Sequence, residues 1–166
     1  MNILITGGCG FKGTELADQL SINHNVTVID TQWFGNYLNN KNIRILKKDI
    51  RNLDSQFLKG IDSVIHLANI ANDPGVDLNP VLSWEVNVLA TQKLIEGCIK
   101  NKVKHFIFAS SGSVYGVKDE LQVTEDLDLV PISTYNKTKM AAERVILSYK
   151  DNINIHIIRP ATVCGY

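Results

Sequence analysis

Six short apolar runs recur along the chain, and each is followed by a stretch with a longer repeat. The runs are NILIT (2–6), VTVID (26–30), IRIL (43–46), SVIHLA (63–68), HFIFAS (105–110) and INIHIIRP (153–160). They are rich in Ile and Val and do not alternate cleanly with polar residues. Strands buried on both faces of a parallel sheet have this pattern, because helices cover both of their sides. We therefore predict six strands at these positions.

The stretches between the runs place apolar residues three and four positions apart, as an amphipathic helix does. The longer ones span 11–21, 80–100 and 135–149, and a short helix is predicted over 53–59. The segment 31–42 contains a glycine and several Asn and predicts a loop. Strands that alternate with helices form right-handed βαβ units. The expected fold class is therefore α/β: a Rossmann-type, doubly wound parallel sheet of about six strands with helices on both faces.

Composition and charge narrow the class of protein. The 166 residues suit one domain, and 45% hydrophobic with 20% charged residues is a globular composition. Lys+Arg and Asp+Glu both number 17, and this zero net charge gives no support to a nucleic-acid-binding surface. The three cysteines are widely spaced without a CxxC pair, which argues against a disulfide framework or a metal site and favours a reducing cytosol. Since no apolar run has the length of a membrane span and no signal peptide is recognisable, we expect a cytoplasmic protein without a membrane partner.

The segment TGGCGFKG (6–13) places Gly7, Gly10 and Gly13 between the first predicted strand and the helix after it. In a dinucleotide-binding fold the first glycine permits a sharp turn and the second lets a pyrophosphate approach the backbone. The third lets the helix pack close to the sheet. The helix N-terminus then offers free N–H groups to the phosphates. A tight turn without a ligand would also explain three glycines, but the order strand, glycines, helix, strand favours a cofactor site.

Asp30 ends the second predicted strand, at the distance from the glycines where an acidic residue hydrogen-bonds the adenosine ribose. A carboxylate there would repel a ribose 2′-phosphate, and the segment 31–36 contains no Arg. We therefore expect NAD as the cofactor, and tighter binding of NADH than of NADPH. A solvated residue at a strand end is the alternative explanation of Asp30.

Tyr135 and Lys139 are four residues apart, so on a helix they share one face. A free tyrosine titrates near 10 and is a poor base at neutral pH, but an ammonium group beside it favours the phenolate. Ser111, after the fifth predicted strand, could bridge a substrate hydroxyl to the phenol. Such a trio can remove a proton from an alcohol while a hydride passes to nicotinamide. An amphipathic helix also explains the YxxxK spacing without catalysis, so the motif alone does not identify a catalytic site.

These motifs together resemble those of the extended short-chain dehydrogenase/reductases, in particular the N-terminal half of the NAD-dependent nucleotide-sugar epimerase/dehydratase group. The matching segments are TGGCGFKG (6–13), KKDIRN (47–52), HLAN (66–69), WEVNVLAT (84–91), SSGSVYG (110–116), YNKTK (135–139) and RPATVCG (159–165). They follow the order of the family and extend over essentially the whole chain.

The resemblance implies a role for each matching residue. The implied cofactor-binding residues are Gly7, Gly10, Phe11, Gly13, Asp30, Asp49, Ile50, Leu67, Ala68, Asn69, Asn87, Ala109, Tyr135 and Lys139. The implied catalytic residues are Ser111, Tyr135 and Lys139. Asp30 would hold the adenosine ribose, Asp49 with Ile50 the adenine edge, and Asn87 would support the helix that faces the nicotinamide half. A strand-end charge at Asp49 and an ordinary helix residue at Asn87 are the alternatives.

The implied function is that of an NAD-dependent nucleotide-sugar 4-epimerase or related 4-oxidoreductase. A 4,6-dehydratase fits less well, because Gly112 and Ser113 stand where dehydratases carry an Asp-Glu pair. Family members are considerably longer, so we expect residues 1–166 to be an NAD-binding domain without the family's C-terminal substrate domain. This length keeps a second hypothesis open, a non-catalytic NAD-binding module.

The resemblance also implies a homodimer, formed through the helices at 81–100 and 135–149. The apolar residues of these helices exceed what one sheet face needs. Those that we expect at the interface are Trp84, Val88, Val145 and Ile146.

Overall fold

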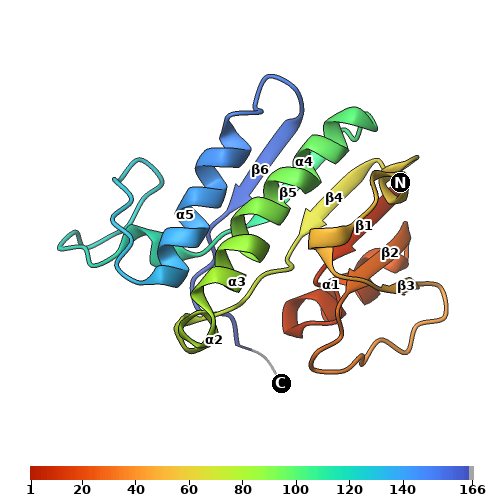
Figure 1. Ribbon diagram of the computed structural model, residues 1–166, viewed down its shortest axis with the longest axis horizontal. Coiled ribbons are helices and arrows are strands. Elements are labelled where there is room, and N and C mark those ends of the chain that lie inside the picture. Colours follow the sequence, from red (N-terminus) through yellow and green to blue (C-terminus); the bar gives the residue numbers. More distant parts are fainter. Residues whose placement is uncertain (165–166) are drawn as a thin grey trace.

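All six predicted strands are present in the computed structural model of the protein, which describes residues 1–164. They are β1 (Asn2–Thr6), β2 (Asn25–Asp30), β3 (Arg44–Lys47), β4 (Ser63–His66), β5 (His105–Ala109) and β6 (Asn154–Ile158). All pair in parallel, in the order β3-β2-β1-β4-β5-β6 (Figure 1). The order therefore reverses between β1 and β4, which confirms the doubly wound α/β prediction.

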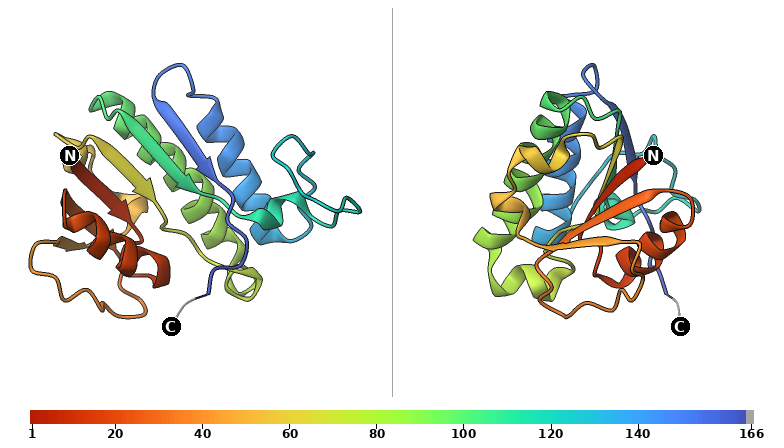
Figure 2. Two further views of the ribbon diagram at one scale, coloured as in Figure 1. Left: turned by 180° about the vertical axis from the view of Figure 1, so that it is seen from behind. Right: turned by 90° about the vertical axis from the view of Figure 1, so that its right-hand side faces the viewer.

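Helices lie on both faces of the sheet (Figure 2). One face carries α1 (Phe11–Ser21), and the other carries α3 (Pro80–Trp84), α4 (Ala90–Lys100) and α5 (Thr134–Leu147). Each face has its own core: Ile3 and Ile5 of β1 pack with Ala17 of α1, whereas Leu4 packs with Leu94 of α4. Successive strand side chains point to opposite faces, so a continuous apolar run supplies both cores.

The helical segment before β5 is more divided than the sequence predicts. A π-helical turn, Glu85–Leu89, joins α3 to α4, and a short unpredicted helix, α2 (Asp73–Leu78), precedes them. The side-chain oxygen of Asn79 accepts a hydrogen bond from the amide of Leu82 and so starts α3 as a separate element. Apolar spacing does not reveal such a cap. The predicted helix at 53–59 is likewise smaller, a 3₁₀ turn at Ser55–Leu58 that follows another at Ile50–Asn52.

Two of the residues expected at a dimer interface are in the interior of the chain. Val88 is 8% exposed, and Ile146 is fully buried in the core that also contains Leu94 of α4. Trp84 is 40% exposed, and Val145 is half-buried. More of the apolar residues of these helices are therefore buried within the chain than we expected.

The α1 face is open over the last strands, where Figure 2 shows no helix in front of β5 and β6. Ile158 is 55% exposed there, and the rings of His105 and His156 lie with their centroids 5.6 Å apart. Within residues 1–164, none of the helices combines the length and apolar character needed to cross a membrane. Gly165, the last residue of the RPATVCG motif, lies outside the described residues.

Candidate active site

A cleft opens at the carboxyl ends of the strands, near the point where the strand order reverses. Open α/β sheets bind their ligands at this point. Its volume of about 400 Å³ is within the range of cofactor sites. The expected residues that line it are Gly7, Gly10, Phe11, Gly13, Asp30, Asp49, Ile50, Leu67, Ala68, Asn69, Ala109, Tyr135 and Lys139. Segments from both halves of the chain thus meet around one space.

The glycine loop needs residues without a Cβ at two of its positions. Gly7 has a φ of +73°, and a Cβ there would lie 2.5 Å from the backbone nitrogen of Ala68. A Cβ on Gly13 would lie 2.5 Å from the carbonyl oxygen of Gly7. Gly13 therefore keeps α1 close to the loop that precedes it, whereas we expected it to keep α1 close to the sheet.

The N-terminus of α1 borders the cleft. Its N-cap is Gly10, and no side chain among the described residues caps the amides of the first turn. Phe11, Lys12 and Gly13 of this turn line the cleft. Free amides, the positive end of the helix dipole and the Lys12 ammonium make this end suitable for phosphate groups.

The Asp30 carboxylate joins two loops at the end of β2. Its Oδ2 accepts a hydrogen bond of 3.0 Å from the amide of Cys9, and its Oδ1 accepts one of 2.7 Å from the amide of Gln32. Each carboxylate oxygen has a second lone pair, so a ribose hydroxyl can still donate to it. Burial, followed by the Asp30 charge, raises the pKa of the Cys9 thiol to about 11, which keeps this thiol protonated and unreactive at neutral pH.

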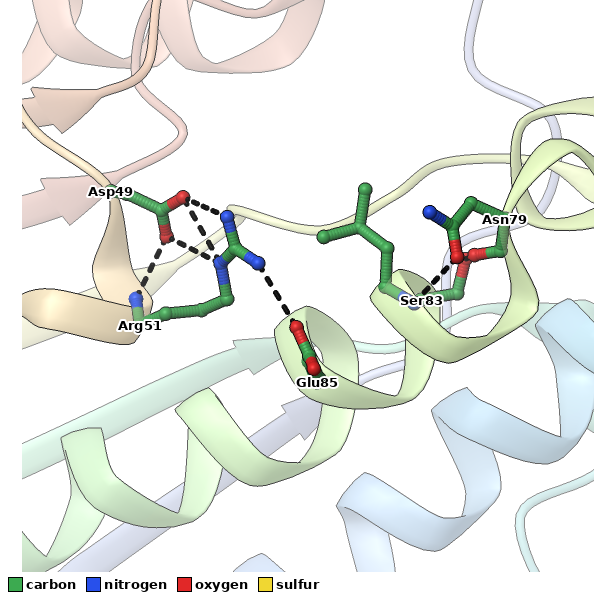
Figure 3. A network of polar contacts seen from close by, with 6 residues as sticks. Asp49, Arg51, Asn79, Ser83 and Glu85 are labelled. Atoms are coloured by element: carbon green, nitrogen blue, oxygen red, sulfur yellow. Dashed lines mark hydrogen bonds and ion pairs between the residues drawn. The ribbon is translucent and has the colours of Figure 1, made fainter.

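Asp49 lies at the rim of the cleft with its carboxylate paired to Arg51 (Figure 3). Arg51 Nη2 is 2.7 Å from Asp49 Oδ2, and its Nη1 is 3.0 Å from Glu85 Oε2 in the π-helical turn. Hydrogen bonds from Arg51 hold the pKa of Asp49 below its usual value. Asp49 therefore has a structural contact, whether or not it also binds a ligand. Ile50, which follows it, is buried.

Asn87 does not line the cleft; it holds a segment that does. Its Oδ1 accepts a hydrogen bond of 2.7 Å from the amide of Ile70, and its Nδ2 donates to the Ile70 carbonyl and to the Thr138 hydroxyl. With 1% exposure, Asn87 cannot touch a ligand in this arrangement. The structure thus gives it an indirect role, through the position of the segment after β4.

His66, a fully buried residue at the end of β4, links β1 to α4. Its Nδ1 is 2.6 Å from the Thr6 hydroxyl, and its Nε2 is 2.8 Å from the Thr91 hydroxyl. Because the Thr91 hydroxyl donates its proton to the Asn87 carbonyl, it must accept one from His66 Nε2. The imidazole is therefore the neutral Nε2–H form. Burial, with a contribution from Lys139, lowers the pKa of His66 to about 3.

Tyr135 and Lys139 lie one turn apart on α5, and both line the cleft. Lys139 is 2% exposed, and its Nζ is 4.5 Å from the centroid of the Phe108 ring. Burial and then the charge of Lys12 lower the pKa of Lys139 to about 7. The ammonium and the neutral amine therefore coexist near neutral pH.

Tyr135 differs from expectation in its titration. Burial raises its pKa, a hydrogen bond with Ser111 opposes this in part, and the charge of Asp73 adds to the rise. We expected the Lys139 ammonium to lower this pKa. Instead, removal of the phenolate from water has the largest effect.

A chain of hydrogen bonds extends from Ser111 through Ser113 to Asn136 on α5. The Ser111 Oγ is 2.7 Å from the Ser113 Oγ, and Ser113 donates a hydrogen bond of 2.6 Å to Asn136 Oδ1. Ser111 also caps the 3₁₀ turn Gly112–Tyr115, which fixes its position after β5. Sequence reasoning did not identify Ser113 or Asn136 as part of this group.

Other cleft residues also escaped the sequence analysis. Trp33 and Phe34 line the cleft from the loop after β2 and are 57% and 89% exposed. Two adjacent aromatic residues in a polar loop, just after Asp30, were a usable signal. Lys48 also lines the cleft, beside Asp49, and nothing in the sequence pattern marks it. Across residues 1–164, no group of three or more His, Cys, Asp or Glu side chains is placed to hold a metal ion.

Known proteins resemble this chain over nearly its whole length. The model of the "NAD dependent epimerase/dehydratase family" matches residues 3–166. The uncharacterized UDP-glucose epimerase YtcB of Bacillus subtilis (strain 168) is 34% identical over 95% of this chain and 54% of its own length.

Solved structures agree with this match. The UDP-glucuronic acid 4-epimerase from Bacillus cereus in complex with NAD has a TM-score of 0.90 and 37% identity, over 99% of this chain and 57% of its own. The UDP-N-acetylglucosamine 4-epimerase from Methanobrevibacter ruminantium M1, in complex with UDP-N-acetylmuramic acid, has a TM-score of 0.90 and 33% identity. It matches 95% of this chain and 54% of its own. The chain thus spans about half the length of these relatives.

Proposed function

The chain belongs to the NAD dependent epimerase/dehydratase family, and on this basis we propose that it is the NAD-binding part of a nucleotide-sugar 4-epimerase or related sugar-nucleotide 4-oxidoreductase. One observation carries the proposal. Tyr135 and Lys139 line the same cleft as the glycine loop, although they come from opposite ends of the chain. A proton-transfer group and a phosphate-binding turn therefore border one space.

The cleft suits NAD in three respects that do not depend on the relatives. The N-terminus of α1 offers its first amides to phosphates, and Asp30 can accept from a ribose hydroxyl. In addition, Asn69 Oδ1 is buried and has no hydrogen-bond partner among the described residues, so a bound group with an N–H or O–H would satisfy it. When bound, NAD would take a hydride from the sugar carbon and return it.

The residues of α5 and of the segment after β5 would handle the proton. The Tyr135 oxygen would accept the proton of the sugar hydroxyl and later give it back, and Ser111 would hold that hydroxyl by a hydrogen bond. The charged form of Lys139 would stabilise the phenolate when Tyr135 is deprotonated. Its pKa of about 7 leaves this charge adjustable near neutral pH.

The substrate class rests on the relatives and on the residues after Ser111. Two of the similar solved structures, those from Bacillus cereus and Methanobrevibacter ruminantium M1, are epimerases of UDP-sugars. Gly112 and Ser113 carry no carboxyl group, so this segment lacks the acid and base that loss of water would need. A 4-epimerase or a 4-oxidoreductase is therefore favoured over a dehydratase.

The test combines cofactor binding with turnover. The intact protein, of which residues 1–166 are the proposed NAD-binding part, is titrated with NADH and then incubated with NAD and UDP-glucose, UDP-glucuronic acid or UDP-N-acetylglucosamine, with the sugars resolved by NMR. We expect NADH binding and conversion of one sugar to its 4-epimer or 4-keto form. Absence of NADH binding would contradict the proposal, and binding without conversion of any sugar would favour the non-catalytic NAD-binding module.

We propose NAD rather than NADP because the Asp30 carboxylate stands at the end of β2. Lys48, however, lines the same cleft and could attract a 2′-phosphate. Fluorescence titrations of wild type, Asp30→Asn and Lys48→Met separate the two effects. We expect wild type to favour NADH, Asp30→Asn to reduce that preference, and Lys48→Met to keep it. Equal affinities of wild type for NADH and NADPH would contradict the assignment.

A homodimer through the α3–α5 surface is also part of the proposal. Trp84, Leu89 and Leu147 are 40%, 53% and 38% exposed on these helices and the turn between them. Light scattering at high concentration should give twice the chain mass, and Trp84→Glu should lower it. Val117→Glu, at an 81% exposed position in another loop, is the control. A monomeric wild type would rule the dimer out.

We place the protein in the cytoplasm, a proposal that rests on its cysteines. Cys9 and Cys98 are buried and Cys164 is exposed, and all three are free thiols. Free thiols persist in a reducing compartment.

A further inference from the structure

Glu143 is a buried carboxylate on the sheet side of α5, with 1% exposure. Arg159, just after β6, donates from Nε to Oε1 at 3.0 Å and from Nη2 to Oε2 at 2.8 Å. The Ser110 hydroxyl also donates to Oε1. A buried carboxylate is costly unless it is paired and hydrogen-bonded, and Glu143 meets both conditions.

The residues around Glu143 are neighbours of the proposed catalytic residues in sequence or on the same helix. Ser110 directly precedes Ser111, so its hydrogen bond fixes the end of β5 from which Ser111 projects. Lys139 lies one turn before Glu143 on the same helix, so the two side chains share one helix face, while the ion pair that Glu143 forms is with Arg159. Arg159 extends the network through Nη1 to the Tyr115 hydroxyl, at 2.7 Å. One carboxylate thus connects α5 with the ends of β5 and β6.

Several charged and titratable groups face Lys139 from the surrounding elements. Lys12 approaches from α1, and His66 lies below it on β4 in its neutral form. Tyr135 and Glu143 share its helix, the Phe108 ring of β5 lies against Nζ, and Arg159 lies behind Glu143. Asp73 of α2 acts on Tyr135. Among these groups Glu143 is the one whose negative charge acts on Lys139, and it raises the pKa that burial and Lys12 lower.

We propose that Glu143 is a positioning residue of this site, which holds Ser111 through Ser110 and keeps Lys139 charged through its own negative charge. The inference rests on the proposed function only in taking Ser111 and Lys139 as catalytic. The charge coupling itself belongs to the free protein and can be measured without cofactor or substrate.

The test follows the protonation of Lys139 by NMR in protein labelled with ¹³C at lysine Cε, with the signal assigned from Lys139→Met. Glu143→Gln removes the charge and keeps the size, so the midpoint should fall by about one pH unit, a tenfold change in the dissociation constant. Lys12→Met should move the midpoint in the opposite direction. Glu96→Gln, which neutralises an exposed carboxylate on α4, should leave it unchanged.

The direction in which the Lys139 midpoint moves distinguishes a loss of charge from a loss of packing. A loosened site would admit water and raise the midpoint towards the ordinary lysine value, whereas loss of the Glu143 charge lowers it. An unchanged or raised midpoint in folded Glu143→Gln would overturn the proposal. If Glu143→Gln does not fold, Glu143→Asp replaces it, and a midpoint unmoved by this displacement of the charge would overturn the proposal equally.

Ser110→Ala tests the other half of the proposal, that Glu143 holds Ser111 in place through Ser110. It removes one hydrogen bond and no charge, so the Lys139 midpoint should stay in place while turnover falls at unchanged NADH affinity. Turnover equal to wild type would contradict the proposal that Glu143 positions Ser111. Inactivity of the wild-type protein would count against the proposed function and would leave the Lys139 measurement intact.

Discussion

The two walls of the cleft are built in opposite ways. The wall formed by β1 and α1 presents backbone, and its close approaches depend on the absence of side chains at Gly7 and Gly13. The wall formed by α5 presents functional side chains, and Lys139 and Glu143 are both almost fully buried. We therefore expect the first wall to be disturbed by added side-chain volume, and the second by the loss of a charge.

This difference predicts that substitutions on the two walls have different effects. An added methyl group on the backbone wall collides with atoms that cannot move without shifting β4 or α1. A removed charge on the other wall leaves the shape intact and changes the protonation of its neighbours. Substitutions on each wall, compared with matched controls elsewhere, can therefore test the contrast.

The largest effect is expected on the side-chain wall, from Tyr135→Phe in the turnover assay of the intact protein. Loss of the phenolic proton carrier should lower the rate about 10²- to 10⁴-fold while NADH affinity stays near wild type. Tyr149→Phe, at a half-buried tyrosine outside the cleft that donates to Glu96, should keep full activity. Comparable turnover in Tyr135→Phe would mean that another group transfers the proton.

On the backbone wall, Gly7→Ala tests the role of volume. Its Cβ would meet the Ala68 backbone at 2.5 Å, on top of the strain of a φ of +73°. Gly60→Ala is the matched control, because Gly60 has a φ of +77° and nothing within 4 Å of the added Cβ. In urea unfolding we expect Gly60→Ala to cost about 1–2 kcal/mol and Gly7→Ala about 3 kcal/mol or more. Equal losses would show that the conformation alone matters at Gly7.

His66 links β1 to α4, and its burial predicts a dependence of stability on pH. Its folded pKa of about 3 lies below the ordinary value near 6.5, so between these values only the unfolded chain binds the proton. The free energy of unfolding should therefore fall as the pH drops through this window, by about 1.4 kcal/mol per pH unit for this group.

Comparison of wild type with His66→Gln by urea unfolding between pH 6.5 and 5 isolates this contribution. The variant should lose that part of the slope, and His156→Gln, at an exposed position on β6, should retain it. The same slope in wild type and His66→Gln would contradict the assignment of a buried neutral imidazole.

The smallest effect is expected at the rim, where Trp33 stands on the backbone side. Stacking on a bound cofactor would contribute about 0.5–1.5 kcal/mol, so Trp33→Phe should weaken NADH binding only a few-fold. NADH should quench the fluorescence of wild type and of Trp84→Phe, and this quenching should be lost in Trp33→Phe. Quenching that persists in Trp33→Phe would place the cofactor away from this loop.

Much of the molecule follows from local patterns in the sequence. The strands, α1 and α5 are predicted from apolar spacing, because strands such as β1 bury both faces and a helix buries one. The glycine loop is recognised because it directly follows a strand, and Asp30 because it ends the next one. The division of the segment before β5 was not predictable, since Asn79 and the π-helical turn interrupt a continuous apolar pattern.

The sequence alone therefore determined the fold class, the glycine-rich turn between β1 and α1, and the presence of Tyr135 and Lys139 on one helix face. Only the tertiary structure showed that burial raises the pKa of Tyr135, that Asn87 acts through Ile70, and that Glu143 faces the site from within. Periodicity is a property of neighbouring residues and is visible in the chain. Desolvation and ion pairing depend on residues that are distant in sequence, so they exist only once the sheet has brought those residues together.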